Sequence, residues 1–248
     1  MIQLRSQTEI ANIKKASRIV ALVLEDLKGF VKPGCTTKDL EVRAVQLIEK
    51  ENAESAFKGY RGYPGFICTS VNEQVVHGIP GAYRLKEGDI IGIDVGVKLN
   101  GYYGDGAVTV SLGNVKPVIE KLVKVTSEAL YKAIEKAVVG NRIGDISSAI
   151  QAHVEKNGFS VVRDYVGHGV GTAVHEEPSI PNFGSPGAGL RLKAGMVLAI
   201  ETMVNLGDWR VKLLDDGWTA VTVDKEPSAH FEHTIAVGDK GPEILTIL

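Results

Sequence analysis

Two apolar segments, 107 residues apart, each carry one acidic residue at the same position, and this repeat restricts how the chain can fold. Asp94 interrupts the first segment and Glu201 the second, and five of the thirteen aligned residues are identical. Each segment is followed by another run with its own acid, Asp105 in the first case and Glu232 in the second. Apolar runs of this length and spacing predict two antiparallel β-hairpins, each with two carboxylates. The aligned segments are residues 85–97 and 192–204.

Carboxylates inside apolar runs need a partner. An ionised carboxylate without one either shifts its pKa or binds a cation. For any single acid, pairing with a lysine or capping a turn is the better explanation. For acids at matched places in two repeated strands, a shared cation is the better one, and it gives the first indication of function.

The overall composition is that of a globular protein. Of the 248 residues, 44% are hydrophobic, and 28 basic against 30 acidic residues give a net charge of −2. This balance argues against nucleic acid as the main partner. The sequence has no signal-type N-terminus and no apolar run of membrane-spanning length, so we expect a cytoplasmic protein without membrane contact. Cys35 and Cys68 form no C-x-x-C pair and are expected to be reduced thiols.

Helix signals precede both acid-bearing segments. Ser6 and Glu9 form a capping-box pattern, and Gly or Pro residues follow each periodic stretch. Asn100-Gly101 predicts a tight turn between a strand at Ile90–Val97 and a return strand at about Tyr103–Val110. The expected helices run from Ser6 to about Gly29, from Thr37 through Ile48, from about Pro117 to Gly140, and from about Asp145 to Gly158.

The helical segments repeat as well. Residues 34–50 superpose on residues 140–156 at an offset of 106, and no linker rich in Pro, Gly or Ser separates the two sets. We therefore expect one α+β domain over residues 1–248. Its halves, about 1–113 and 114–248, would be related by a pseudo-twofold axis, with an antiparallel sheet, outer helices and a site in the groove between them.

One histidine fits the acid set. His168 lies between Gly167 and Gly169, and residues without side chains allow its ring to approach a small target. Four carboxylates and one imidazole suit Mn, Fe, Co or Zn better than Ca or Mg. Five ligands shared by two ions leave positions for water, which is typical of a catalytic site. The predicted ligands are Asp94, Asp105, His168, Glu201 and Glu232.

The other histidines divide into two groups. His153 falls on an expected helix and is interpreted as a surface or packing residue. His233 follows Glu232 and, by strand alternation, points away from it. His77 and His175 belong to repeated His-x-x-Pro motifs just before the acid-bearing strands, and for these two we expect a functional role.

These motifs resemble those of the methionine aminopeptidases, and the similarity extends over essentially the whole chain. The motifs are residues 71–80, Gly167–Gly171 with the His-Glu-Glu-Pro that follows, and Glu232-His-Thr-Ile. The short N-terminus resembles the bacterial type I form, which has no zinc-binding extension. The resemblance implies the pita-bread fold, with internal pseudo-twofold symmetry, and a monomer that acts on N-terminal methionine near the ribosome.

The resemblance also implies a role for each site residue. Asp105 and Glu232 would bridge two divalent ions, Asp94 would complete one site, and His168 with Glu201 would complete the other. The ions would be Co, Mn, Fe(II) or Zn, and the water they activate would attack the first peptide bond.

Two histidines and Glu201 would act on the substrate directly. His175 would stabilise the oxyanion by hydrogen bonding. His77 would contact the scissile amide or the leaving nitrogen, and Glu201 would accept a proton from the attacking water.

A methionine pocket is implied around Tyr60, Tyr63, Cys68 and Trp218, with Phe57 nearby. Sulfur over aromatic edges is a favourable contact for a thioether. Without the family match, ordinary core packing would explain these aromatic residues equally well. Two positions depart from the family pattern: Val174 stands where an aromatic residue is expected, and His230 stands where Gln is expected. Both could alter the pocket or the residue tolerated after the methionine.

The sequence thus predicts a metalloaminopeptidase that removes N-terminal methionine when the second residue is small. Two alternatives remain. Prolidase and aminopeptidase P share the fold and ligands, but they usually carry a large extra N-terminal domain for which this chain has no room. Non-catalytic relatives bind other proteins after losing metal ligands, whereas all five ligands remain here.

Overall fold

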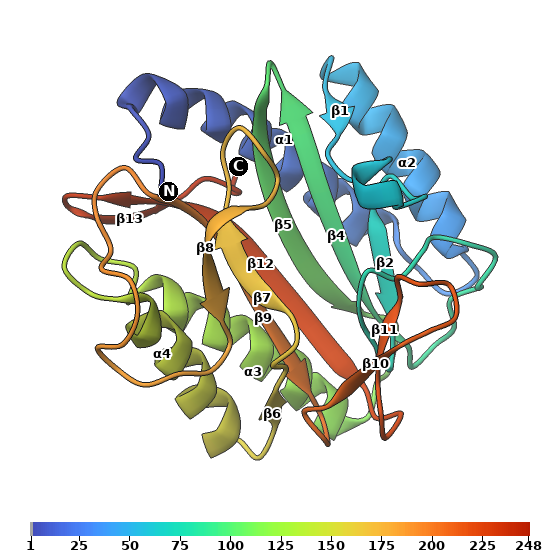
Figure 1. Ribbon diagram of the computed structural model, residues 1–248. Coiled ribbons are helices and arrows are strands. Elements are labelled where there is room, and N and C mark those ends of the chain that lie inside the picture. The colour runs from blue at the N-terminus through green and yellow to red at the C-terminus, as the bar shows by residue number, and fades with distance from the viewer. Residues whose placement is uncertain (1) are drawn as a thin grey trace.

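A curved antiparallel sheet backed by helices forms the body of the computed structural model, which describes residues 2–248 (Figure 1). Within that range the main sheet has ten strands, ordered β1-β4-β5-β12-β9-β7-β8 along its path, and β10, β11 and β3 form a second sheet. The helices are α1 (Gln7–Phe30), α2 (Thr37–Lys50), α3 (Pro117–Ile134) and α4 (Ile143–Lys156), with a 3-10 turn at Tyr60–Gly62. The strands are β1 (Glu54–Ser55), β2 (Cys68–Val71), β3 (Gln74–Val76), β4 (Ile90–Leu99), β5 (Tyr102–Ser111), β6 (Ser160–Val161), β7 (Val166–Gly169), β8 (Glu176–Pro181), β9 (Val197–Asn205), β10 (Val211–Leu213), β11 (Ala220–Thr222), β12 (Ser228–Gly238) and β13 (Gly241–Ile244).

Each acid-bearing strand pair has its own covering helix. Helix α1 packs against β4 and β5, and α3 packs against β9 and β12; both lie behind the sheet in Figure 1. One apolar cluster holds Val20, Leu27 and Ile93, and another holds Leu130 and Ile200, all fully or almost fully buried. The helices therefore fill one face of the sheet with apolar contacts, and polar groups are left to the opposite face.

The helix starts agree with the expected caps more closely than the helix ends do. Ser6 caps α1 and Glu9 completes the capping box, as expected. Helix α4 begins two residues before Asp145, because that carboxylate accepts the backbone N–H of Arg142 at 2.7 Å and so occupies the third helical position. None of the helices in the described part of the chain is both long and apolar enough to cross a membrane.

The expected end of the third helix at Gly140 is wrong. Helix α3 ends at Ile134, six residues earlier, because the following amides bond to carbonyls only two or three residues back. Ala137 N–H donates to Ile134 O at 2.9 Å, and Val138 N–H donates to Lys136 O at 2.9 Å. These tight turns bring the chain to Gly140, whose φ of 97° is one that glycine adopts without strain.

The first expected hairpin is confirmed, with slightly longer strands. Strands β4 and β5 pair from Ile90↔Ser111 to Leu99↔Tyr102 around Asn100-Gly101, whose φ values of 52° and 80° fit a type I′ turn. Strands β9 and β12 also pair antiparallel along their length, but residues 206–227 form β10, β11 and loops between them. The second acid-bearing unit is therefore a strand pair with a long insertion rather than a tight hairpin.

The segment before α1 is tied to the loop that leads into β8. Arg5 forms an ion pair with Glu176, and their side chains are 4% and 17% exposed. Glu176 also accepts the backbone N–H groups of Thr172 at 2.8 Å and Ala173 at 3.0 Å. Burial acts to raise the pKa of Glu176, but the guanidinium and the two amides hold it below its ordinary value of 4.5. This network fixes the loop that carries His175.

We expect Arg5→Met to lower the free energy of unfolding at pH 7 by about 1.5–3 kcal/mol, because it removes the guanidinium from a largely buried carboxylate that keeps its two backbone donors. The pKa of Glu176 is depressed in the folded protein, so the pair stabilises above pH 4.5 and its contribution declines as the pH falls below that value. Urea denaturation at pH 7 and pH 4 measures both effects. Lys14→Met, which breaks the exposed pair with Glu243, should cost less than about 1 kcal/mol. Equal losses for the two variants would contradict the assignment.

Candidate metal centre

The strand register places four acid-bearing strands in line. Asp94 on β4 lies opposite Ala107 on β5, Ala107 lies opposite Glu232 on β12, and Glu232 lies opposite Glu201 on β9. Residues directly opposite one another in a sheet share a face. Three of the four carboxylates therefore form one row across the middle of the sheet, with Ala107 between them.

The remaining two predicted ligands flank this row on the same face. Asp105 is two residues from Ala107 on β5, and strand alternation returns its side chain to the same side. His168 on β7 lies opposite Ala199, which is two residues from Glu201. Backbone pairing thus brings together all five residues that the sequence predicted as metal ligands.

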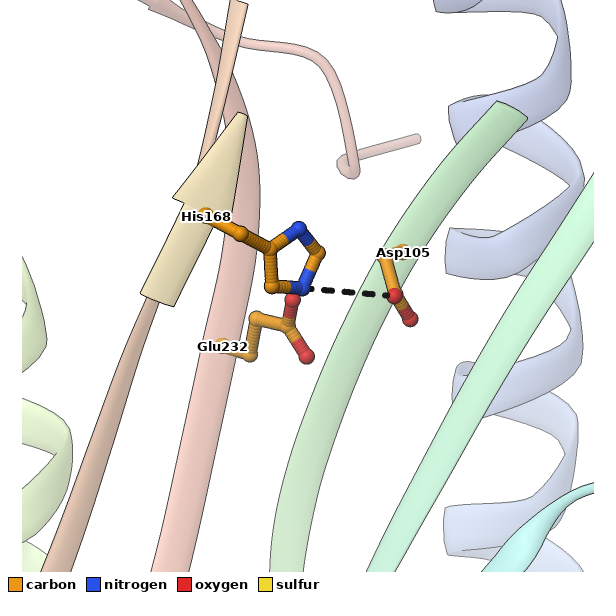
Figure 2. A group of neighbouring side chains, drawn as sticks. All are labelled: Asp105, His168 and Glu232. Carbon is orange, nitrogen blue, oxygen red and sulfur yellow. Dashed lines mark ion pairs between the residues drawn. The ribbon is translucent and has the colours of Figure 1, made fainter. Parts of the chain in front are cut away.

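The side-chain atoms of this set lie close together. Figure 2 shows Asp105, His168 and Glu232 converging from three strands, and one donor atom of each lies within 4.8 Å of the others. His168 Nε2 lies 3.9 Å from Asp105 Oδ2 and 3.7 Å from Glu201 Oε1. His168 Nδ1 lies 3.0 Å from its neighbour's carbonyl oxygen, and only a protonated Nδ1 makes that bond. The Nε2 lone pair therefore faces the acids, as in a metal-binding histidine.

The glycines beside His168 have a packing role. An ideal Cβ on Gly167 would lie 2.6 Å from Ala199 O, and one on Gly169 would lie 2.3 Å from Glu177 O. The backbones of β8 and β9 therefore approach β7 too closely for any side chain at these two positions. This differs from the reason expected from the sequence, which was access of the ring to a small target.

The acids repel one another in a buried setting. Burial, with the neighbouring acids, raises the pKa of Asp105 and of Glu232 well above the ordinary range. Burial also raises the pKa of Asp94 to about 7, although His230 opposes the shift. Glu201 differs: burial acts to raise its pKa, but His230, His168 and His77 together hold it below its usual value.

A divalent cation fits this donor set. Asp94 Oδ1 and Glu232 Oε1 are enclosed without any hydrogen-bond partner. Buried carboxylate oxygens without partners are unfavourable, and positive charge at this point would satisfy both and relieve the repulsion. One imidazole among carboxylates suits Mn, Fe, Co or Zn.

One cavity of about 200 Å³ contains every residue for which the sequence predicted a role. Two wider hollows, of about 610 and 570 Å³, are lined by none of these residues, so size alone does not identify the site. Arg61 and Val76 also line the cavity and were not predicted. Arg61 belongs to none of the motifs, and Val76 lies within the 71–80 motif but has an apolar side chain without chemistry of its own. The predicted residues that line it are Phe57, Tyr60, Tyr63, Cys68, His77, Asp94, Asp105, His168, His175, Glu201, Trp218 and Glu232.

The two histidines from the repeated motifs both line the cavity, in different surroundings. The ring centroid of His175 lies 4.2 Å from that of His168, and the ring stacks on Tyr60 at 5.1 Å. Burial and the neighbouring His168 lower the pKa of His175 to about 3, so its ring is neutral at pH 7. His77 packs edge-to-face against Tyr165 at 5.3 Å, and burial lowers its pKa as well.

The apolar end of the cavity is an aromatic cluster. Tyr63 meets Trp218 edge-to-face at 5.1 Å, and its hydroxyl lies 3.1 Å from Ile67 O and 3.0 Å from Gly78 O. Cys68 is buried opposite Asp94 on the neighbouring strand, and burial raises its pKa, so it is a neutral thiol at pH 7. Val174 packs into the same cluster but does not line the cavity, so its departure from the family pattern lies behind the residues that do.

The two histidines that we interpreted as non-functional lie outside the cavity. His153 Nε2 lies 3.0 Å from Glu128 Oε2 on the neighbouring helix. His233 Nδ1 lies 2.8 Å from Thr246 Oγ1, and its Nε2 lies 3.3 Å from the Tyr131 hydroxyl, on the helix side of the sheet. Both placements confirm the interpretation from the sequence.

His230 was treated in the sequence only as a departure from a pattern, yet it lies beside the acid set. Its Nε2 is 3.5 Å from Glu201 Oε2. Strand alternation could have located it, because His230 is two residues before Glu232 and must share its face.

We expect the metal-free protein to lose stability as the pH rises from about 6.5 to 8. Below this range the lowered pKa of the buried His77, His175 and His233 has the opposite effect on stability, and that effect ends near the ordinary histidine pKa of 6.5. The raised pKa of Asp94, Asp105 and Glu232 means that folding keeps protons on these groups, so the free energy of unfolding falls as they ionise. A loss of at least about 1 kcal/mol, the size of a one-unit shift, should be seen by urea denaturation in chelator. Added Mn²⁺ should abolish it, and Asp94→Asn should reduce it. Stability that rises over this range in chelator would contradict the placement of the acids.

Comparison with known proteins relates the chain to one family along most of its length. The pattern described as Metallopeptidase family M24 matches residues 11–239. The methionine aminopeptidase of Clostridium perfringens (strain 13 / Type A) is 54% identical over 248 residues, and the alignment covers 100% of both chains.

Solved structures of other proteins have the same fold as this chain. The methionine aminopeptidase of Thermotoga maritima superposes with a TM-score of 0.99 at 50% identity, and the superposition covers 100% of both chains. Prolidase from Pyrococcus furiosus superposes with a TM-score of 0.81 at 22% identity, over 99% of this chain and 65% of that one, which is a likeness of fold alone. Together they confirm the α+β pita-bread fold expected from the sequence.

Proposed function

This chain belongs to metallopeptidase family M24, and we propose that it removes the N-terminal methionine from proteins and peptides whose second residue is small. One observation carries the proposal: a single cavity joins the acid–histidine set to an aromatic pocket. Its volume of about 200 Å³ is below the roughly 300–1,000 Å³ of sites for drug-sized ligands. Such a cavity suits one terminal side chain better than a longer stretch of peptide.

Two divalent ions are the proposed cofactor. Asp94, Asp105 and Glu232 would hold one ion, and His168 and Glu201, with Asp105 and Glu232 shared, would hold the other. Asp105 and Glu232 suit the shared role because they come from the two central strands, β5 and β12. The ions could be Co, Mn, Fe(II) or Zn, and when bound they supply a water of lowered pKa and polarise the substrate carbonyl.

The neighbouring side chains orient and stabilise the reacting peptide. His175 has a neutral ring and donates a hydrogen bond to the carbonyl oxygen as negative charge develops on it. His77, which also lines the cavity, contacts the scissile amide or the leaving nitrogen. Glu201, which is ionised in its histidine-rich setting, accepts a proton from the attacking water.

The methionine side chain would lie among Tyr60, Tyr63, Cys68, Phe57 and Trp218. Aromatic edges and a neutral thiol form an apolar, polarisable wall that suits a flexible thioether. Gly96 allows this wall to approach the strand that carries Asp94, because an ideal Cβ there would lie 2.4 Å from the Phe57 ring. The pocket therefore places the substrate's first residue directly beside the acids.

We further propose that residues 1–248 form a single catalytic domain with duplicated halves of about 1–113 and 114–248. The enzyme would act as a cytoplasmic monomer on new proteins near the ribosome. These proposals follow from the repeated sequence segments and from the resemblance to methionine aminopeptidases.

Peptide assays with added Mn²⁺ or Co²⁺ test the function. We expect cleavage of Met-Gly and Met-Ala peptides, little cleavage of Met-Leu or x-Pro peptides, and no turnover by a folded His168→Ala variant that lacks a metal-facing nitrogen. Activity on x-Pro peptides alone would favour a prolidase-like enzyme. A purified protein that neither binds these ions nor cleaves any peptide would favour a non-catalytic binding role.

We expect Trp218→Ala to raise KM for Met-Ala peptides about 10-fold or more, because it removes aromatic area from the methionine pocket, while kcat changes less. The measurement is kcat and KM for peptides that begin with Met, norleucine or Leu. Trp209→Ala is the matched control, since the other tryptophan of the chain packs under Arg163 and does not line the cavity. Unchanged discrimination between Met and Leu in the Trp218 variant would remove this residue from the pocket.

A further inference from the structure

His230 is an imidazole beside the acid set that none of the proposed roles uses. It lies on β12, two residues before Glu232 and on the same face of the sheet. The residue is only 3% exposed, and its Nε2 is enclosed without a hydrogen-bond partner. Buried polar atoms in folded proteins are nearly always paired, so this nitrogen needs a partner within the site.

The strand register gives His230 a defined counterpart. A twofold rotation about the Ala107–Glu232 pair exchanges β5 with β12, and it places Asp94 on Glu201 and Asp105 on His230. Two threonines mark the same symmetry. Thr234 Oγ1 bonds to both backbone groups of Asp105, at 3.0 and 2.7 Å, and Thr109 Oγ1 bonds to both backbone groups of His230, at 2.9 and 2.8 Å. His230 therefore stands in the second half where Asp105 stands in the first.

Glu201 lies between two imidazoles, one facing each of its oxygens. His168 Nε2 is 3.7 Å from Oε1, and His230 Nε2 is 3.5 Å from Oε2. The two rings differ in their hydrogen bonds. His168 Nδ1 carries a proton and donates it to a backbone carbonyl, so His168 Nε2 presents a lone pair. His230 Nε2 faces Glu201 Oε2, and only a protonated Nε2 can donate to a carboxylate oxygen. A shift of about 0.6 Å brings the two atoms to a normal N–H···O distance of about 2.9 Å.

His230 lies behind Glu201 rather than in the substrate space. Glu201 lines the cavity, but His230 does not. A contact with the residue after methionine, one of the effects that the sequence left open, therefore has little support from this placement.

We propose that His230 is a positioning residue for Glu201. Its Nε2–H donates to Glu201 Oε2 and so leaves Oε1 directed toward His168 Nε2, and these two atoms would then be available to a cation. The proposal rests on the proposed metal centre and adds to it the residue that orients one ligand. Such indirect contacts commonly change metal affinity by 10–100-fold when they are removed.

The test compares two replacements of His230. Glutamine carries an N–H group at a similar reach, whereas leucine has a similar bulk and no donor. The probe is Co²⁺ alone, titrated calorimetrically into metal-free protein, together with the visible d–d absorption of the Co²⁺-loaded protein. We expect His230→Leu to weaken binding by about 10–100-fold and to change the absorption bands. His230→Gln should stay within a factor of about 3 of the parent and keep its bands. In peptide assays, kcat should fall in the leucine variant while KM changes little.

Control variants distinguish loss of the contact between His230 and Glu201 from a general loss of stability. His153→Leu removes an imidazole that pairs with Glu128 and does not line the cavity, and it should leave binding unchanged. If His230→Leu does not fold, His230→Met provides an unbranched side chain without a donor. Parent-like Co²⁺ affinity and bands in the leucine or methionine variant would overturn the proposal. So would equal losses in the glutamine and leucine variants, which would make His230 a direct ligand. If the parent protein itself binds no Co²⁺, the proposed metal centre fails before His230 is tested.

Discussion

Mutual repulsion among buried carboxylates is the constraint on which the structure depends. Asp94, Glu232 and Glu201 lie in one row across strands that pair edge to edge, and Asp105 lies beside them. Helices seal the opposite face of the sheet with apolar side chains, so the acids cannot turn away into solvent. Backbone pairing therefore holds negative charges together, and cations are the means of relieving the repulsion. The same hydrogen bonds that build the sheet thus create the affinity for metal.

Much of this arrangement could be predicted from the sequence alone, because successive side chains of a strand alternate between the two faces of the sheet. The alternation placed Asp94 and Asp105 together across the Asn100-Gly101 turn and turned His233 away from Glu232. Helix starts were also predictable, since capping residues act locally. The end of α3 was not, because its last expected turn gives way to tight turns that lead to Gly140. Arg61 could not be identified as a lining residue, because its place depends on a loop rather than on a periodic element.

Where β5 pairs with β12, the backbone arrangement is symmetric but the side chains are not. Thr109 and Thr234 make equivalent bonds across it, yet the residues that they hold are an imidazole and a carboxylate, His230 and Asp105. A strictly symmetric set would give two equal halves with no direction for a substrate. Here His168 and His230 lie around Glu201 and lower its pKa, while the pKa values of Asp94, Asp105 and Glu232 are raised. The fold supplies a symmetric frame, and in the proposed mechanism a few substitutions within it separate metal-binding, proton-accepting and positioning roles.

Side chains from both strand pairs are proposed to hold two divalent ions in one cavity. Anomalous scattering from crystals grown with Mn²⁺ tests this proposal most directly. We expect two peaks in the cavity, one contacted by Asp94 and the other by His168 and Glu201, with Asp105 and Glu232 contacting both. Crystals whose cavity shows no anomalous peak at saturating Mn²⁺, or whose peaks lie away from these five side chains, would contradict it.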